Sequence, residues 1–210
     1  MATSSSTKIT STIGSPDRWR LDGKTVFITG GTKGIGKAIV EEYGALGARV
    51  FTCARSGPDL AACLKEWTSK GYEVEGMAVD ISDSEARRAL MEQVAGSFVG
   101  RLDVLINNVG TNVRKPTVQY TQEEYDHVMD VNLKSTYHLC QLAHPLLKKA
   151  GKSCVVNVGS VAGVTAIKSG MFSRLREGGR EGWGRSWEVG RRRKVEEGKE
   201  GSPSLDLSSS

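Results

Sequence analysis

A glycine-rich turn joins an apolar segment to a helical pattern near the start of the chain. Val26-Phe27-Ile28 is followed by Thr29-Gly-Gly-Thr-Lys-Gly-Ile-Gly36 and then by a helix-like pattern. The first turn of such a helix leaves backbone N–H groups unpaired, and their partial positive charge favours a phosphate. A side chain at Gly30 or Gly34 would obstruct the turn or a pyrophosphate, and one at Gly36 would hold the helix off the strand.

A glycine pattern of this kind can also be a plain turn between a strand and a helix. Its context favours nucleotide binding, because a strand pattern precedes it and a helix pattern follows it. A second β-rich segment, residues 49–53, lies at the distance expected for a strand on the adenine side.

Between residues 21 and 159, short β-branched segments alternate with longer helical patterns, as in a parallel sheet covered on both faces. The predicted strands are 25–29, 49–53, 73–79, 104–107 and 153–158, and the predicted helices are 34–46, 58–70, 83–98 and, in two parts, 123–149. Ser82 with Glu85 and Thr121 with Glu124 predict capping boxes. Right-handed crossovers then give an α/β, Rossmann-type doubly wound sheet of order 3-2-1-4-5, with ligands at the carboxyl ends of strands one and four.

Composition excludes several other classes of protein. The chain has 210 residues, of which 38% are hydrophobic and 25% charged, as in one soluble domain. No apolar run approaches the ~20 residues of a membrane span, so no membrane partner is expected. The basic run 191–194 is flanked by glutamates, which favours a solvated segment over a nucleic-acid contact. The four cysteines lack metal-ligand spacing, and we expect reduced thiols and no metal.

The motifs together resemble the short-chain dehydrogenase/reductase family, and residues 18–24 resemble its plant tropinone-reductase-like members. The resemblance covers residues 19–170. It implies cofactor contacts by Gly30, Thr32, Lys33, Gly34, Ile35, Gly36, Asp80, Asn107, Asn108 and Gly110, and catalytic roles for Asn132 and Ser160. Val109 stands where the family motif usually has alanine, a change that we expect not to alter cofactor binding.

The charge at the end of the second strand bears on the choice of cofactor. An acid there would bind the ribose diol of NAD, whereas a base attracts the 2′-phosphate of NADP. This chain has Arg55, with no acid in residues 52–56, and Lys33 is placed to supply a second cation. The alternative is that both are ordinary solvated bases. We expect Arg55 and Lys33 to select NADP(H).

The resemblance also implies a reaction, in which a hydride passes between nicotinamide and a small carbonyl or alcohol substrate. Ser160 would orient the carbonyl, and Asn132 would hold a water in the proton relay. The alternatives are a hydroxyl that caps the strand end for Ser160 and an asparagine bonded to its own backbone at a helix kink for Asn132. The match of the whole motif set favours the family roles.

The family's tyrosine and lysine should follow at positions 173 and 177, where this chain has Ser173 and Glu177. Serine does not have a suitable pKa for the proton donor, and a carboxylate has the wrong charge to replace the lysine. The expected function is therefore that of an NADP(H)-dependent ketone reductase, in a chain with little or no turnover. The alternatives are an NADP(H)-binding pseudoenzyme or subunit partner without catalysis, and a fragment without a function.

The predicted organisation has three parts. Residues 1–18 form a disordered tail, residues 19–170 an incomplete NADP-binding Rossmann domain whose C-terminal strands and helices are missing, and residues 171–210 a disordered, non-native tail. The Ser/Thr-rich, acid-free start resembles a plastid transit peptide, which is the alternative. Its single Lys, the lack of Arg in residues 1–15 and its short length favour a cytoplasmic protein. The intact family forms homo-oligomers, and we expect that interface to be disrupted here. The fifth strand should be an apolar edge prone to aggregation.

Overall fold

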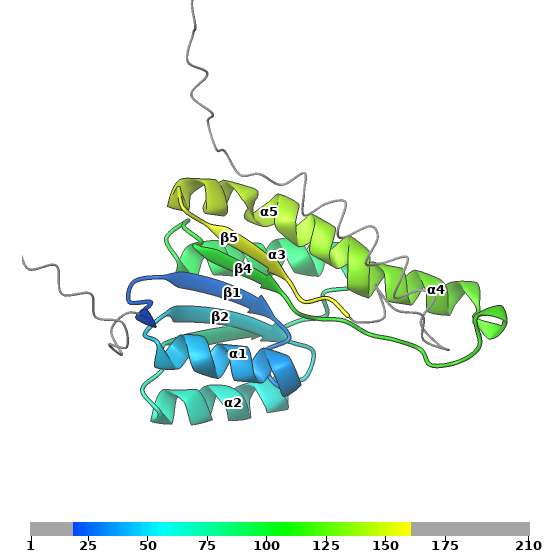
Figure 1. Ribbon diagram of the computed structural model, residues 1–210, viewed down its shortest axis with the longest axis horizontal. Helices are drawn as coiled ribbons and strands as arrows, with labels where there is room; N and C mark the ends of the chain where they lie inside the picture. Colours follow the sequence, from blue (N-terminus) through cyan, green and yellow to red (C-terminus); the bar gives the residue numbers. More distant parts are fainter. Residues whose placement is uncertain (1–18, 161–210) are drawn as a thin grey trace, which may run out of the picture.

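The computed structural model describes residues 19–160, which form one parallel sheet covered by helices (Figure 1). Its five strands are β1 (Thr25–Thr29), β2 (Arg49–Ala54), β3 (Val74–Ala78), β4 (Val104–Asn107) and β5 (Cys154–Asn157). The helices are α1 (Gly34–Ala45), α2 (Gly57–Ser69), α3 (Ser84–Ser97), α4 (Gln122–Met129) and α5 (Ser135–Ala150). The strand order β3-β2-β1-β4-β5 confirms the predicted Rossmann-type topology. The two predicted tails, 1–18 and 171–210, lie outside the described residues.

The central strand β1 is buried along its whole length. Its side chains alternate between the two faces of the sheet, so Val26 and Ile28 pack on one side and Phe27 on the other. β1 pairs in parallel with β2 and with β4. A strand that is covered on both faces needs apolar residues at successive positions, which explains the continuous apolar segment in the sequence.

Two helical layers cover the sheet. On one face α1 and α2 bury Val40 and Trp67, and on the other α3 and α5 bury Leu90 and Leu139 (Figure 1). All four side chains have no exposed surface. No helix within residues 19–160 is both long and apolar enough to cross a bilayer.

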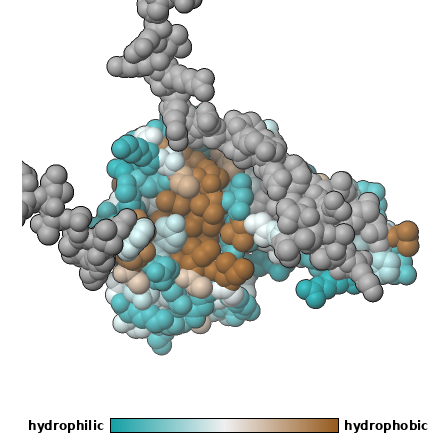
Figure 2. Space-filling view, viewed as in Figure 1, coloured by the Kyte–Doolittle hydropathy of each residue, from teal (hydrophilic) through white to brown (hydrophobic). Residues whose placement is uncertain are grey.

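The sheet ends at β5, which has β4 as its only neighbour among the described strands. Figure 2 shows an apolar surface on the side of the sheet that α1 and α2 cover only in part. Val156 of β5 is 39% exposed, and Val104 and Val158 are partly buried. Within the described chain β5 is thus an edge strand, as predicted, while its aggregation stays a prediction.

One of the two predicted capping boxes is correct. Thr121 and Glu124 exchange both reciprocal hydrogen bonds at the start of α4. The Ser82–Glu85 box is wrong, because α3 begins one residue later than it requires. Asp83 is the N-cap and accepts from the backbone N–H of Ala86 at 2.8 Å, while the N–H of Ser82 donates to Asp80 Oδ1 at 2.9 Å. The backbone N–H of Ser82 is therefore bonded within the turn after β3, and Asp83 caps α3 in its place.

The long helix predicted over 123–149 is divided, as expected, into two parts. Between α4 and α5 the segment Asp130–Lys134 forms a π-helical turn, in which the wider backbone spiral changes the hydrogen-bond pattern. Two hydroxyl groups donate hydrogen bonds to carbonyls of this turn. Ser135 Oγ donates to Val131 O at 2.6 Å, and Thr136 Oγ1 donates to Asn132 O at 3.3 Å. Asn132 lies in the middle of this turn.

A buried carboxylate ties β1 to β4 at the amino end of the sheet. Asp103 is 3% exposed and accepts from Arg101 at 2.8 Å, from the backbone N–H of Thr25 at 3.1 Å and from Lys24 at 3.2 Å. Burial alone would raise the pKa of Asp103, but these hydrogen bonds outweigh it and lower the pKa to about 2.

Asp103→Asn should lower the free energy of unfolding at pH 7 by about 1–3 kcal/mol, because the amide cannot accept all the bonds made to the carboxylate. The native pKa lies below the unfolded value of about 3.9, so this stabilisation is complete above that value and is lost as the pH falls toward 2. Urea unfolding at several pH values should show a weaker acid dependence in the variant. Glu92→Gln, an exposed change on α3, is the control, and equal acid dependence in all three proteins would contradict this role.

Candidate functional site

The glycine loop joins β1 to α1 at the carboxyl edge of the sheet. A Cβ on Gly36 would lie 2.0 Å from the carbonyl oxygen of Gly30, and one on Gly30 would lie 2.8 Å from Val109 Cγ2. Gly34 has no atom within 4 Å of such a Cβ, but its φ of +55° favours glycine. Gly31, which is not among the residues predicted for the site, is also confined, because a Cβ there would lie 2.2 Å from Thr52 Oγ1.

The first turn of α1 is arranged to accept an anion. Its N-cap residue, Lys33, makes no side-chain capping hydrogen bond, and the turn contains no acid. Most helices satisfy these N–H groups with a serine, threonine, aspartate or asparagine cap. An uncapped N-terminus beside glycines leaves the positive end of the helix dipole to a ligand.

Thr29 and Asn108 connect the ends of β1 and β4 and shape this loop. Thr29 Oγ1 accepts from the N–H groups of Asn108 and Val109 at 3.0 and 3.1 Å. The Asn108 amide donates to the carbonyls of Thr29 and Gly30 at 2.9 and 3.2 Å. Asn108 thus holds the loop in place. Asn107 is buried, and its amide donates to Asn157 Oδ1 at 2.9 Å, which ties β4 to β5.

A cavity of about 320 Å³ opens beside the glycine loop. Seven of the residues proposed from the sequence line it, namely Gly30, Thr32, Lys33, Arg55, Asp80, Asn108 and Gly110. Gly34, Ile35, Gly36, Asn107, Asn132 and Ser160 are not among its lining residues. The cavity therefore gathers the ends of β1, β2, β3 and β4, which the strand order predicts.

His127 also lines the cavity, and sequence analysis did not identify it. It lies four residues before Val131, another lining residue, so both side chains share one helical face. The Thr121–Glu124 capping box fixed the start of α4 and could have revealed this face. A hydrogen bond from the backbone N–H of Ser82 lowers the pKa of Asp80 most, and the nearby charge of Arg55 lowers it further.

A second hollow adjoins the first at the start of α2. It is lined by Thr32, Lys33, Arg55, Ser56 and Asp59, so the two predicted bases do meet at one corner. Lys33 Nζ forms an ion pair with Asp59 Oδ2 at 2.6 Å, and this pair lowers the pKa of Asp59, with help from Ser56. Residues 52–56 contain no acid, but the first turn of α2 brings Asp59 back to this corner.

The side chain of Asn132 makes two hydrogen bonds to the backbone of Thr111, in the loop after β4. Its Oδ1 accepts from the N–H of Thr111, and its Nδ2 donates to the carbonyl of Thr111, both at 2.7 Å. The alternative of an asparagine bonded to its own backbone is therefore wrong. Thr111 lines the cavity, so Asn132 fixes one of its walls. Its role in a proton relay stays a prediction.

Ser160 is exposed at the carboxyl edge of the sheet, three residues after β5. Its catalytic role is a prediction that rests on the resemblance. Positions 173 and 177 lie outside the described residues. All four cysteines are free thiols, and within residues 19–160 no group of three or more potential ligands could hold a metal ion.

Gly36→Ala should destabilise the protein by about 3 kcal/mol, at the upper end of overpacking effects, since the new methyl group meets a backbone carbonyl. Gly96→Ala in α3 is the matched control, because a Cβ there has nothing within 4 Å. It should be neutral or stabilise by up to about 1 kcal/mol. Urea unfolding measures both effects, and equal stability of the two variants would contradict the steric role of Gly36.

The chain is similar to plant tropinone reductase homologues, among other proteins. A tropinone reductase homologue of Arabidopsis thaliana is 50% identical over 153 residues, which are 73% of this chain and 58% of that protein. A second homologue from that plant, named chloroplastic, is 48% identical over 157 residues, 75% of this chain and 49% of that protein. The chain thus spans about half to three-fifths of these relatives.

The solved structure is a metagenomic short-chain oxidoreductase in complex with NADP. It has a TM-score of 0.74 and 34% identity, with 79% of this chain and 75% of that chain covered. The family model for short chain dehydrogenases matches residues 24–172. With the sheet order and the glycine loop, this match shows that the chain belongs to the short-chain dehydrogenase family.

Proposed function

We propose that residues 19–160 bind NADP(H) at the carboxyl edge of the sheet. One observation carries this proposal. A single cavity adjoins the uncapped start of α1, the cations Lys33 and Arg55, and the carboxylate of Asp80. The pyrophosphate fits the glycine loop, where Gly30 and Gly36 leave no room for a side chain. The NADP in the related solved structure supports the same choice of cofactor.

The 2′-phosphate would lie in the second hollow. Arg55 presents a planar fork of donors and Lys33 a point charge, a combination that suits a phosphate. Asp80, which lines the larger cavity together with Arg55, would contact the adenine. Asn108 acts indirectly, because its hydrogen bonds set the path of the loop.

The proposed reaction is the reduction of a small ketone, or the reverse oxidation of an alcohol, as in tropinone-reductase-like enzymes. NADP(H) supplies or accepts the hydride when bound. Ser160 would orient the carbonyl oxygen by a hydrogen bond, and Asn132 would position the wall at Thr111 and a water of the proton relay. Catalytic roles for these two residues rest on the family resemblance.

With Ser173 and Glu177 at the family's tyrosine and lysine positions, we propose that this sequence binds cofactor with little or no turnover. An NADP(H)-binding pseudoenzyme or subunit partner is the second candidate, favoured by a complete cofactor corner without those two groups. Co-purification with an intact relative would distinguish a subunit partner from an isolated binding protein. We propose homo-oligomers and a ketone substrate for the full-length members of the family.

We propose a cytoplasmic location, with the plastid as the second candidate because one relative is named chloroplastic. A fluorescent fusion of the whole chain distinguishes the two. Plastid fluorescence would exclude the first.

Arg55→Asp should weaken NADPH binding about 10- to 100-fold and leave NADH binding equal or tighter, because a carboxylate repels the 2′-phosphate and accepts from a ribose diol. Fluorescence titration with both cofactors measures the ratio of their dissociation constants. Lys65→Asp makes the same charge change at an exposed position of α2 that lines neither hollow, and should leave the ratio unchanged. An unchanged ratio in Arg55→Asp would exclude this corner as the phosphate site.

Asp59→Asn should strengthen NADPH binding about three- to tenfold with little effect on NADH. The carboxylate holds Lys33 at 2.6 Å, so it competes with the phosphate and also repels it. The same pair of titrations measures this change, with Glu92→Gln as a control for the loss of one negative charge. Weaker NADPH binding in a folded Asp59→Asn protein would mean that Asp59 supports the site.

A further inference from the structure

Arg87 of α3 is a fully charged side chain with almost no contact with solvent. It is 1% exposed and is among the largest fully buried side chains of the described chain. Its Nη1 donates to the carbonyls of Ile81 and Ser82 at 2.5 and 3.0 Å, and its Nε donates to His138 Nδ1 at 3.0 Å. A buried guanidinium needs such acceptors, because unsatisfied donors there are costly.

The two carbonyls bound by Arg87 belong to the turn after β3, and one of them is that of Ile81, which lines the cavity. Asp80 and Ile81 line that cavity, and the N–H of Ser82 donates to Asp80 Oδ1 at 2.9 Å. The turn is therefore held from both sides, by Asp80 within the cavity and by Arg87 behind it. Its position fixes the carboxylate that faces the adenine side.

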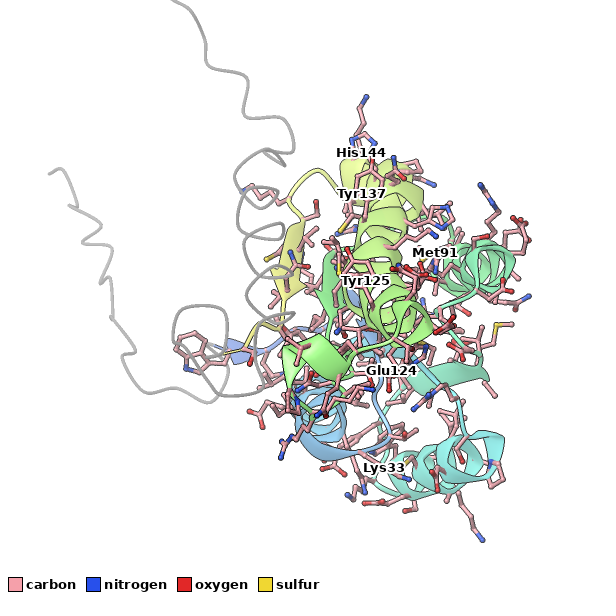
Figure 3. The ribbon with its side chains drawn as sticks, turned by 90° about the vertical axis from the view of Figure 1, so that its right-hand side faces the viewer. Lys33, Met91, Glu124, Tyr125, Tyr137 and His144 are labelled. Carbon is pink, nitrogen blue, oxygen red and sulfur yellow. The ribbon has the colours of Figure 1, made fainter. Side chains whose placement is uncertain are left out.

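His138 of α5 accepts from Arg87. α5, which carries the labelled Tyr137 and His144, packs beside α3, which carries Met91 (Figure 3). The Nδ1 of His138 accepts a hydrogen bond and so carries no proton in this arrangement. Protonation of Nδ1 would remove the acceptor of Arg87 Nε and place a second cation beside it. The contact can therefore exist only with a neutral imidazole.

We propose that Arg87 is a positioning residue for the adenine wall and that His138 makes this support dependent on pH. Neutral His138 fixes Arg87, and Arg87 fixes the Asp80–Ser82 turn in its binding geometry. Protonated His138 releases Arg87 and loosens the turn. The inference rests on the proposed function for its effect on cofactor, and on the hydrogen bonds alone for its effect on the turn.

The surrounding charges favour the neutral imidazole. Burial lowers the pKa of His138 most, the nearby Arg87 and Arg88 lower it further, and Glu85 opposes them. All three charged residues belong to α3. The negative charges of Asp130 and Asp83 stabilise the charged form of Arg87, not that of His138.

The direction of the pH effect follows from this pKa. Because the pKa of His138 is lowered when the turn is fixed, the open turn binds more protons at acidic pH. The fixed turn is thus favoured over the open turn at pH values above the ordinary histidine pKa of about 6.5. Its population falls as the pH drops below that value. Cofactor that requires the fixed turn should bind more weakly over the same range.

The test compares histidine variants of the full chain, which has three histidines in all. His138→Gln keeps an oxygen that can accept from Arg87 but does not titrate. His144→Gln is the matched control, because His144 is an exposed histidine of the same helix and lies at the end away from Lys33 (Figure 3). Both variants retain His127, so any effect of that cavity residue is common to all three proteins.

Two measurements are made at pH 7.5 and at pH 5.5. Hydrogen exchange, corrected for the intrinsic rate at each pH, reports the protection of the turn at residues 80–83 without cofactor. Fluorescence titration reports the dissociation constant for NADPH. In the wild type and His144→Gln we expect lower protection at pH 5.5 and an affinity loss about fivefold larger than in His138→Gln.

Equal pH dependence in all three proteins would overturn the proposal. If none binds NADPH at either pH, the proposed function fails, and hydrogen exchange still decides whether His138 controls the turn. Should His138→Gln fail to fold, hydrogen exchange in the wild type is decisive, since pH-independent protection of residues 80–83 would itself contradict the role of His138.

Discussion

The hydrogen bonds between Thr29 and Asn108 at the carboxyl ends of β1 and β4 are the constraint on which the site depends. The chain leaves these neighbouring strands toward opposite faces of the sheet, which opens a crevice between them. Four side-chain-mediated bonds of 2.9–3.2 Å join the two ends across it. The glycine loop, the start of α1 and the cavity all take their positions from this junction.

Charged side chains of both signs line the cavity. Lys33 and Arg55 place two positive charges at one corner, where Asp59 pairs with Lys33 as a bound anion would. Asp80 adds a carboxylate to the cavity wall, and its turn is bonded to the buried Arg87. A ligand that carries both a phosphate and a hydrogen-bonding base matches this set of charges. The pair Lys33–Asp59 is largely exposed, so exchange of its partner costs little free energy.

Local patterns predicted most of the fold because its central strands β1, β2 and β4 are largely buried. The continuous apolar segment of β1 and the glycines at 30 and 36 follow directly from that burial and from a close approach of backbone to backbone. Lys33 and Arg55 were predicted from the charges beside the two turns, whereas Asp80 was identified by resemblance, and all three line the cavity. Asn132 was identified by resemblance, but its bond to Thr111 spans 21 residues and has no local signal.

What the sequence did not show depends on contacts between distant segments. Asp59 and His127 reach the cavity region only after helices α2 and α4 are placed against the sheet. In the sequence Arg87 does not differ from the other bases of a charged helix. Only the fold brings His138, 51 residues away, beside it. The shifted cap at Asp83 has the same origin, because the preceding Ser82 is used by the turn at Asp80.

The most direct measurement is a two-dimensional NMR titration of the isotope-labelled full chain with NADPH. We expect saturable shifts of the amide signals of Gly30–Gly36, Arg55–Ser56 and Asp80–Ile81, which adjoin the two hollows. The amides of Thr25 and Asp103 at the opposite edge of the sheet should stay unchanged. Saturable shifts centred elsewhere, or no shifts in a folded chain, would contradict the central claim that this edge binds the cofactor.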